Sequence, residues 1–186
     1  MCPQEPRPKL RSEPVRRAVI ALLIKTLRQY DGGLPDNCTD EKLAEELEDA
    51  IDCHYGMDGY ALASHLESEY LWAPDATLVE ELDMCATYFT REHHKAVREW
   101  VVRNKVKAPF QKDTRATWIL HGQPCKGVVL EVHEDTAEFI VKIDTDGPVP
   151  SKLEGSLKGL YALPYEEVTA DGGTEAAAVS TSNADS

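Results

Sequence analysis

The sequence has no apolar run approaching the ~20 residues that a membrane-spanning helix needs. Its start, Met1–Pro6, lacks the charged-then-apolar layout of a signal peptide. There are five cysteines: Cys2, Cys38, Cys53, Cys85 and Cys125. No two of them are separated by a gap of two residues, which excludes the Cys-x-x-Cys pair of a zinc knuckle. Free thiols in a reducing compartment are the favoured interpretation. We therefore expect a cytoplasmic protein that does not enter a membrane.

Motifs of catalysis and of metal binding are also missing. The chain has no Gly-x-Ser-x-Gly elbow, and Gly32–Gly33 lacks the lysine that accompanies a phosphate-binding loop. The adjacent pairs Cys53–His54 and His93–His94 point about 100° apart if helical, so neither pair converges on one ion. We therefore expect no catalytic residues, no cofactor and no metal site, and a protein that is not an enzyme.

Charge is plentiful but unevenly distributed. The chain has 33 acidic and 20 basic residues, a net charge of −13. Residues 1–30 carry +5, residues 31–90 carry −15 with Lys42 as their one basic residue, and residues 91–112 return to +5. An even field of this sign would disfavour nucleic acid, because phosphate binding needs clustered lysines and arginines. The acidic middle and the basic flanks therefore need separate interpretations.

The acidic middle contains like-charge pairs at helical spacing. Between residues 40 and 52, three acidic pairs lie four residues apart, and each destabilises a helix by roughly 0.2–0.5 kcal/mol. A helix selected for stability alone would interleave lysines, so an acidic binding surface and an ordinary solvated face are both consistent with the pattern. The candidate partner-binding residues are Glu41, Glu45, Glu48, Asp49 and Asp52, with a second cluster of Glu67, Glu69, Glu80 and Asp83.

Helical spacing dominates the first part of the chain. Pro14 suits the first turn of one helix and Gly32–Gly33 its end. Further helices are expected after three N-cap candidates: Thr39, Asp58 and Asp75. The last of these is expected to continue to about Asn104, with Thr87–Arg91 as the candidate position of a break.

After Pro109 the period changes to that of strands. Strands are expected at 114–120, 127–132, 136–143 and 157–163, with a short fifth near 164–168. The predicted fold class is α+β, an N-terminal helical bundle followed by a small antiparallel β-barrel. The expected parts are a flexible basic arm (1–13), a helical domain (14–112), the barrel (113–168) and a disordered tail (169–186).

The basic stretch after residue 90 supports a second interpretation. Basic and aromatic side chains there could form a phosphate-binding stripe: Arg91, Lys95, Arg98, Arg103, Lys105 and Lys107, with Trp118. The structural alternative is that cations complement the dipole at a helix C-terminus, or pair with the acidic helix. We favour this alternative.

Two resemblances to known protein families add to these observations. Residues 58–63, 78–83 and 100–109 resemble segments of uncharacterised small phage and prophage proteins, in which a helical region precedes a small β-domain. Residues 127–129, 139–144 and 163–168 resemble small barrels of the Src-homology-3 type. The first resemblance implies an accessory role in the contest between phage and host, in the cytoplasm of a host cell, and neither supplies catalytic residues.

Together these observations favour a non-enzymatic acidic protein that binds a basic, nucleic-acid-binding surface of a host protein and inhibits it as a nucleic-acid mimic. Anti-CRISPR and anti-restriction proteins are examples of this class. An array of carboxylates can occupy sites meant for phosphates and steer the encounter. The alternatives are a nucleic-acid-binding accessory protein that uses the basic segments and the barrel, and a structural or assembly protein.

Overall fold

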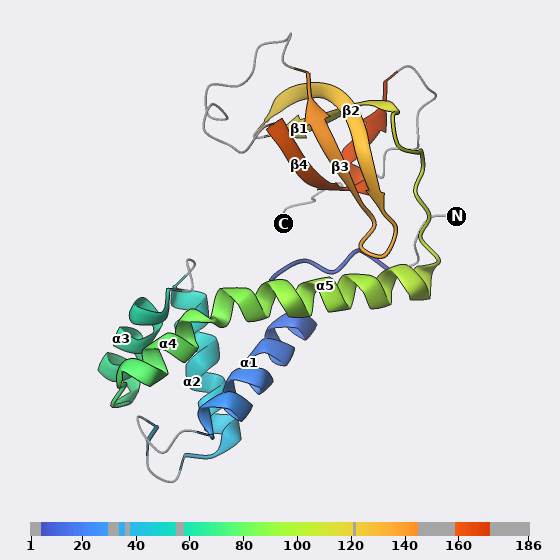
Figure 1. The fold of residues 1–186 in the computed structure, drawn as a ribbon. Coiled ribbons are helices and arrows are strands. Elements are labelled where there is room, and N and C mark those ends of the chain that lie inside the picture. The colour runs from blue at the N-terminus through green and yellow to red at the C-terminus, as the bar shows by residue number, and fades with distance from the viewer. Residues whose placement is uncertain are drawn as a thin grey trace, which may run out of the picture. The chain divides into compact units, whose positions relative to one another are not determined.

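The computed structural model describes residues 5–29, 34–35, 38–54, 58–120, 122–144 and 159–171. These residues divide into a helical unit that ends at Trp100 and a sheet unit that begins at Val101 (Figure 1). The division precedes the boundary at residue 112 that the sequence suggested. The arm residues 1–4, the end signal Gly32–Gly33 and residues 172–186 of the expected tail lie outside the described residues.

The first three helices begin where the sequence predicted. Helix α1 spans Glu13–Leu27, α2 spans Asp40–Cys53 and α3 spans Gly59–Tyr70. The side chain of Thr39 accepts a hydrogen bond from the Lys42 N–H, and that of Asp58 accepts one from the Ala61 N–H. These bonds satisfy amide groups that the first helical turn leaves without a partner.

The long helix expected after Asp75 is broken, but not at Thr87–Arg91. Helix α4 spans Ala76–Asp83, and α5 begins at Cys85 and ends at Asn104. The break falls at Met84, where the Asp83 carboxylate accepts a 3.1 Å hydrogen bond from the Gly59 N–H at the start of α3. A Cβ on Gly59 would lie 2.5 Å from the carbonyl oxygen of Val79, so glycine permits this close approach of α3 to α4.

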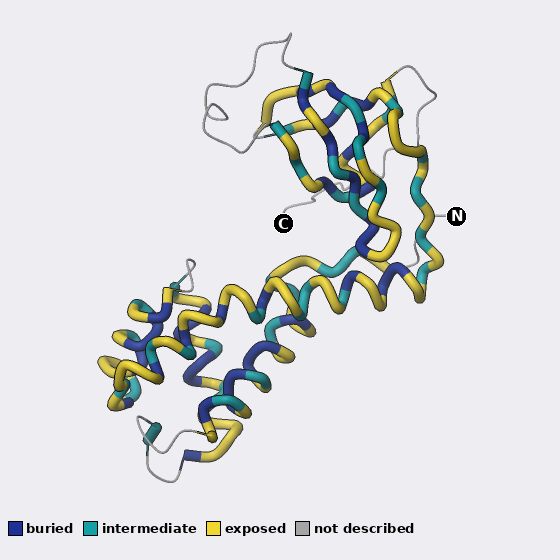
Figure 2. Tube along the Cα trace, in the orientation of Figure 1, coloured by how far each residue is buried: buried dark blue, intermediate teal, exposed yellow. Residues whose placement is uncertain are grey.

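One apolar core joins α1 to α4 and the first turns of α5. Its fully buried members include Leu23, Leu47, Leu66, Leu82 and Phe89. Buried and exposed positions alternate along each helix in Figure 2. Residues buried at intervals of three and four, such as Leu43 and Leu47 on α2, form the apolar side of each helix. No helix among the described residues combines the length and the apolar character that a membrane span requires.

The segment before α1 is not a free arm over its described part. The ring Nε1 of Trp100 donates a 2.9 Å hydrogen bond to the Glu5 carbonyl, and Nε2 of His93 donates a 3.0 Å bond to the Pro8 carbonyl. Both ring N–H groups lie on partly or fully buried side chains and need acceptors, which the chain before α1 supplies. The described part of the expected arm therefore makes contacts with α5 that the sequence did not suggest.

The sheet unit contains five antiparallel strands in the order β4-β3-β2-β1-β5 (Figure 1). Their bounds are β1 Arg115–Leu120, β2 Gln123–His133, β3 Glu138–Ile143, β4 Leu160–Pro164 and β5 Val168–Ala170, with a 3-10 turn at Tyr165–Glu167. The α+β class and the order of helices before sheet are confirmed. Burial alternates along β3, where Phe139, Val141 and Ile143 are buried, as in a strand with one face on the core.

Two expectations for this unit are wrong. The sheet is not closed into a barrel: among the described residues no ladder joins β4 to β5, which remain its two edges. The tail does not begin at residue 169, because Thr169 and Ala170 pair with β1. Both differences arise from pairings between distant strands, which local sequence patterns do not determine.

The inner face of the sheet is filled by aromatic rings. Phe139 stacks on Phe110 with 4.5 Å between ring centroids, and the ring of Tyr165 lies tilted against Phe139 with 4.3 Å between centroids. Gly127 on β2 leaves room for Trp118 on β1, since a Cβ at Gly127 would lie 2.8 Å from the indole ring. Trp118 is consequently buried, with 3% of its surface exposed.

Candidate functional site

Two of the predicted partner-binding carboxylates are ion-paired within the helical unit. The guanidinium of Arg16 on α1 lies 3.0 Å from a carboxylate oxygen of Glu48 and 3.0 Å from one of Asp52, both on α2. Four residues separate Glu48 from Asp52, so both lie on the same side of α2 and face α1. These carboxylates help to hold α1 against α2 and are less available to a partner.

Asp49 is also engaged, on the side of α2 that faces α3. His65 Nε2 donates a 2.9 Å hydrogen bond to Asp49 Oδ2, and the Tyr70 hydroxyl donates a 2.8 Å bond to the same oxygen. These two hydrogen bonds, the one from His65 first, lower the pKa of Asp49. The bond to Asp49 also raises the pKa of Tyr70 to about 12.

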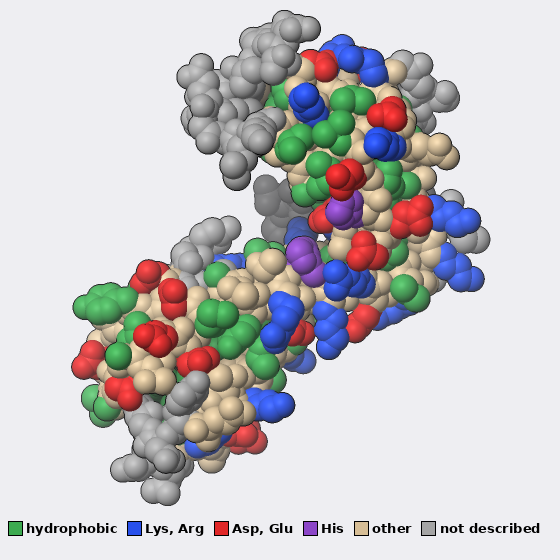
Figure 3. Space-filling view, in the orientation of Figure 1, with side chains coloured by type: hydrophobic (Ala, Val, Ile, Leu, Met, Phe, Trp, Pro, Cys, Tyr) green, Lys and Arg blue, Asp and Glu red, His purple; other side chains and the backbone are tan. Residues whose placement is uncertain are grey.

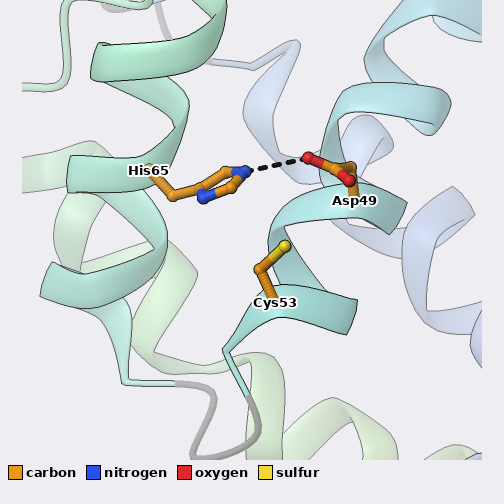
Figure 4. A group of neighbouring side chains, drawn as sticks. All are labelled: Asp49, Cys53 and His65. Atoms are coloured by element: carbon orange, nitrogen blue, oxygen red, sulfur yellow. Dashed lines mark hydrogen bonds and ion pairs between the residues drawn. The ribbon is translucent and has the colours of Figure 1, made fainter.

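Cys53 lies one helical turn after Asp49 and completes a mixed group. A carboxylate oxygen of Asp49, the Cys53 sulfur and a ring nitrogen of His65 lie within 4.8 Å of one another (Figure 4). The ring of His54 meets the ring of His65 edge-on, with 5.1 Å between centroids. Oxygen, sulfur and nitrogen donors from two helices therefore converge at one point of the surface.

A buried carboxylate lies behind the acidic surface. Glu46 is 3% exposed and accepts a 2.6 Å hydrogen bond from the Trp72 indole Nε1. The ammonium of Lys42 lies 3.6 Å from the other oxygen of Glu46. Because a buried charge must be paired and hydrogen-bonded, this contact fixes the segment after α3 against α2.

A shallow hollow lies in front of this contact. Its volume is about 390 Å³, and its walls are Lys42, Glu45, Glu46, Glu69, Tyr70 and Leu71. Glu45 and Glu69 are exposed, and Leu71 exposes 85% of its surface. Leu71 also has a left-handed backbone, with φ at 60°, which is unfavourable for a leucine. The hollow therefore combines two available carboxylates with one projecting apolar side chain.

The remaining predicted carboxylates differ in their surroundings. Glu41, Glu67 and Glu80 are exposed, and within the described part of the chain the structure gives none of them an ion-pair partner. Asp83 is held by the Gly59 N–H. In the helical unit, acidic side chains gather over α3 and α4, and basic side chains over α1 and α5 (Figure 3). Of the predicted partner-binding residues, those that remain available are Glu41, Glu45, Glu67, Glu69 and Glu80.

The half of the basic stripe that belongs to the helical unit is partly neutralised. Arg91 Nε lies 3.2 Å from Glu92 Oε1, and Lys95 Nζ lies 3.9 Å from Glu92 Oε2. The Arg91 guanidinium also lies over the Tyr88 ring, 5.3 Å from its centroid. Arg98 is exposed on the same helix. These contacts lie within α5 itself rather than with the acidic helix that the sequence suggested as a partner.

The other half of the stripe lies in the sheet unit. Arg103, Lys105 and Lys107 are exposed, and Lys107 borders a hollow of about 520 Å³ that also includes Phe110 and Glu134. Trp118 is buried, so its ring is not available to stack on a base. Its Nε1 has no hydrogen-bond partner among the described residues. The aromatic part of the predicted nucleic-acid site is therefore absent from the surface.

Two features of the site were missed from the sequence. Asp49 and Cys53 have the four-residue spacing of ligands on one helix face, but His65 joins them only through the packing of α3 on α2. Leu71 follows the apolar run of α3 and is indistinguishable in sequence from a core residue. The sequence therefore contained a partial signal for the Asp49, Cys53 and His65 group and no signal for the exposure of Leu71.

No protein-family model matches the sequence, and neither a curated protein nor a solved structure is significantly similar to it. The function is therefore argued from the surface of the helical unit itself.

Proposed function

We propose that the chain is a non-enzymatic acidic accessory protein that binds a basic surface of another protein through its helical unit. The binding face consists of Glu41 and Glu45 on α2, Glu69 and Leu71 at the end of α3, and the hollow between them. The proposal rests on one observation: the exposed carboxylates of Glu45 and Glu69 line one hollow together with Leu71, a leucine that is 85% exposed.

Charge complementarity identifies the occupant as a lysine- or arginine-rich protein segment. Of the charged side chains around the hollow, Lys42 and Glu46 pair with each other, so Glu45 and Glu69 remain to attract a cation. A long basic side chain can place its charged head on these carboxylates and its methylene stem against Leu71 and Tyr70. An apolar contact beside the charges adds affinity that salt does not screen.

A partner that normally binds nucleic acid would present such side chains at phosphate spacing. Occupation of those side chains by carboxylates would block the nucleic acid and inhibit the partner, as a nucleic-acid mimic does. This proposal includes the phage anti-defence role that the first resemblance implies.

The face differs from the one that the sequence suggested. Glu48, Asp49 and Asp52 are ion-paired or hydrogen-bonded to other helices, so their reversal would disturb the fold as well as the surface. Glu41, Glu45 and Glu69 are the appropriate residues to reverse, because none of them holds two helices together.

The test measures binding of a fluorescent oligoarginine peptide at low and at moderate salt. The triple variant Glu41→Lys, Glu45→Lys, Glu69→Lys is expected to lose binding, whereas a control with the same net charge, Glu99→Lys, Glu134→Lys, Glu167→Lys, retains most of it. Leu71→Ala is expected to weaken binding more clearly at moderate salt, where screening leaves the apolar contact. Equal losses in the two triple variants would show that only net charge matters, and the face would be wrong.

A second measurement separates mimicry from nucleic-acid binding. The wild-type chain is expected to release a labelled DNA duplex from oligoarginine and to give no gel shift with the duplex alone. A gel shift that weakens steeply with salt would instead support the nucleic-acid-binding alternative.

A further inference from the structure

We infer that Asp49, Cys53 and His65 form a binding site for a zinc-like divalent cation that joins α2 to α3. The inference does not rest on the acidic face, because its three ligands, Asp49, Cys53 and His65, are not part of that face. It rests on the convergence of three donor atoms within 4.8 Å of one another (Figure 4).

The donor set selects the metal. A sulfur, an imidazole nitrogen and a carboxylate oxygen suit Zn²⁺, whereas Mg²⁺ and Ca²⁺ prefer sites made of oxygen alone. One thiolate and one carboxylate also balance the charge of a divalent ion, with His65 as a neutral ligand. When the metal binds, the thiol proton of Cys53 passes to the solvent, and the ring proton of His65 moves through solvent from Nε2 to Nδ1, so that Nε2 gives up its hydrogen bond to Asp49 and binds the metal as a neutral ligand.

The geometry requires side-chain adjustments but no change of backbone. Ligand atoms around tetrahedral zinc lie about 3.3–3.6 Å apart, and the three donors lie within 4.8 Å of one another before any ion is bound. Asp49 and Cys53 are fixed by their four-residue spacing on α2, and His65 already touches Asp49 at 2.9 Å from α3. Since Asp49 and Cys53 are exposed, an ion can enter from solvent and keep a water molecule as its fourth ligand.

Neighbouring side chains support the ligands. The Tyr70 hydroxyl donates a 2.8 Å hydrogen bond to Asp49 and so fixes the direction of its carboxylate. The edge-on ring of His54 restricts rotation of the His65 ring. Such supporting contacts typically change metal affinity by about 10–100-fold, so Tyr70 is a positioning residue of the site.

Cys53 gives the proposal a specific spectroscopic signature. Among the described cysteines Cys53 is exposed, and Cys38, Cys85 and Cys125 are buried. A thiolate-to-metal charge-transfer band on addition of Co²⁺ would therefore report Cys53, with Cys2→Ser as the background that excludes Cys2. His94→Ala is the matched control for histidine loss, because His94 is exposed on α5 outside the group.

The experiment titrates the reduced full chain with Co²⁺ and with Zn²⁺ in competition with a chromophoric chelator. Wild type, Cys2→Ser and His94→Ala are expected to bind one equivalent and to show the charge-transfer band. Cys53→Ser is expected to lose the band, and both Cys53→Ser and His65→Ala to bind zinc at least about tenfold more weakly. Zn²⁺ is also expected to raise the melting temperature of wild type but not of Cys53→Ser.

Two results would overturn the site. One is a wild-type chain without the charge-transfer band; the other is a Cys53→Ser variant that keeps wild-type zinc affinity. Circular dichroism of each variant establishes that it is folded. Should His65→Ala not fold, Cys53→Ser still decides, because the exposed thiol is not part of the core.

Discussion

The indole Nε1 of Trp72 donates a 2.6 Å hydrogen bond to a carboxylate oxygen of Glu46, and both side chains are almost completely buried. This contact ties the segment after α3 to the middle of α2. It supports both the acidic hollow and the close approach of α2 to α3.

Removal of this hydrogen bond is expected to destabilise the helical unit. Trp72→Phe leaves a buried carboxylate without its donor, which should lower the free energy of unfolding by about 1.5–3 kcal/mol beyond the lost packing. Trp118→Phe is the control, because Trp118 is equally buried and its Nε1 has no partner among the described residues. Urea unfolding of the two variants makes the comparison, and equal losses would show that the bond contributes little.

Leu71 is expected to be a residue whose replacement increases stability. Its backbone is left-handed, with φ at 60°, and its side chain is 85% exposed, so Leu71→Gly relieves strain and loses little packing. We expect the free energy of unfolding to rise by about 1 kcal/mol, since glycine's greater freedom in the unfolded chain offsets part of the relief. Leu71→Ala keeps the strain and is the control. A clear loss of stability in Leu71→Gly would indicate that Leu71 packs within the chain.

The pair Asp49 and Tyr70 gives a prediction at high pH. The pKa of Tyr70 is raised to about 12 from its ordinary 10, chiefly by its hydrogen bond to Asp49. Because the folded pKa is the higher one, the contact stabilises the fold fully below pH 10, and this contribution is lost as the pH rises towards 12.

Absorbance titration measures this effect. The difference between the titration curves of wild type and Tyr70→Phe isolates the ionisation of Tyr70. Asp49→Asn is expected to shift this ionisation back towards pH 10. Glu45→Gln removes a carboxylate of the same helix that does not touch Tyr70, and it should leave the titration almost unchanged. Identical curves for wild type and Asp49→Asn would contradict the assignment.

Arg16 is expected to contribute more to the free energy of unfolding than its neighbour Arg17. Arg16 joins α1 to Glu48 and Asp52 on α2 and is 26% exposed, whereas Arg17 pairs with Glu13 on its own helix and is 78% exposed. Arg16→Met should cost about 1 kcal/mol of unfolding free energy, and Arg17→Met close to nothing. Thermal unfolding at low and high salt compares them, and a larger cost for Arg17→Met would reverse the prediction.

Local features of the fold could be predicted from the sequence. The caps at Thr39, Asp58 and Asp75 depend on contacts within three residues, and each side chain caps the helix as expected. The alternation in β3 is equally local. Features fixed by distant contacts were predicted incorrectly or missed: the break at Met84, the ordered segment before α1 and the open sheet.

In the candidate site, too, the sequence could not predict what distant contacts determine. The sequence identified a surplus of carboxylates on α2 but could not distinguish Glu45, which faces solvent, from Asp52, which faces an arginine 36 residues away. Which carboxylate is neutralised depends on the rotation of α2 against α1 and α3. The net charge of the segment was therefore informative, whereas its residue-by-residue assignment required the structure.

The open sheet also bears on how the protein behaves at high concentration. An unpaired strand edge is a template for strands of other molecules and so promotes aggregation. Here one edge is β5, which has three residues, and the other is β4, which ends in Pro164 with no N–H to donate. A short edge and a proline both disfavour the addition of another strand. This part of the chain therefore resists growth into fibrils even though its edges are not joined.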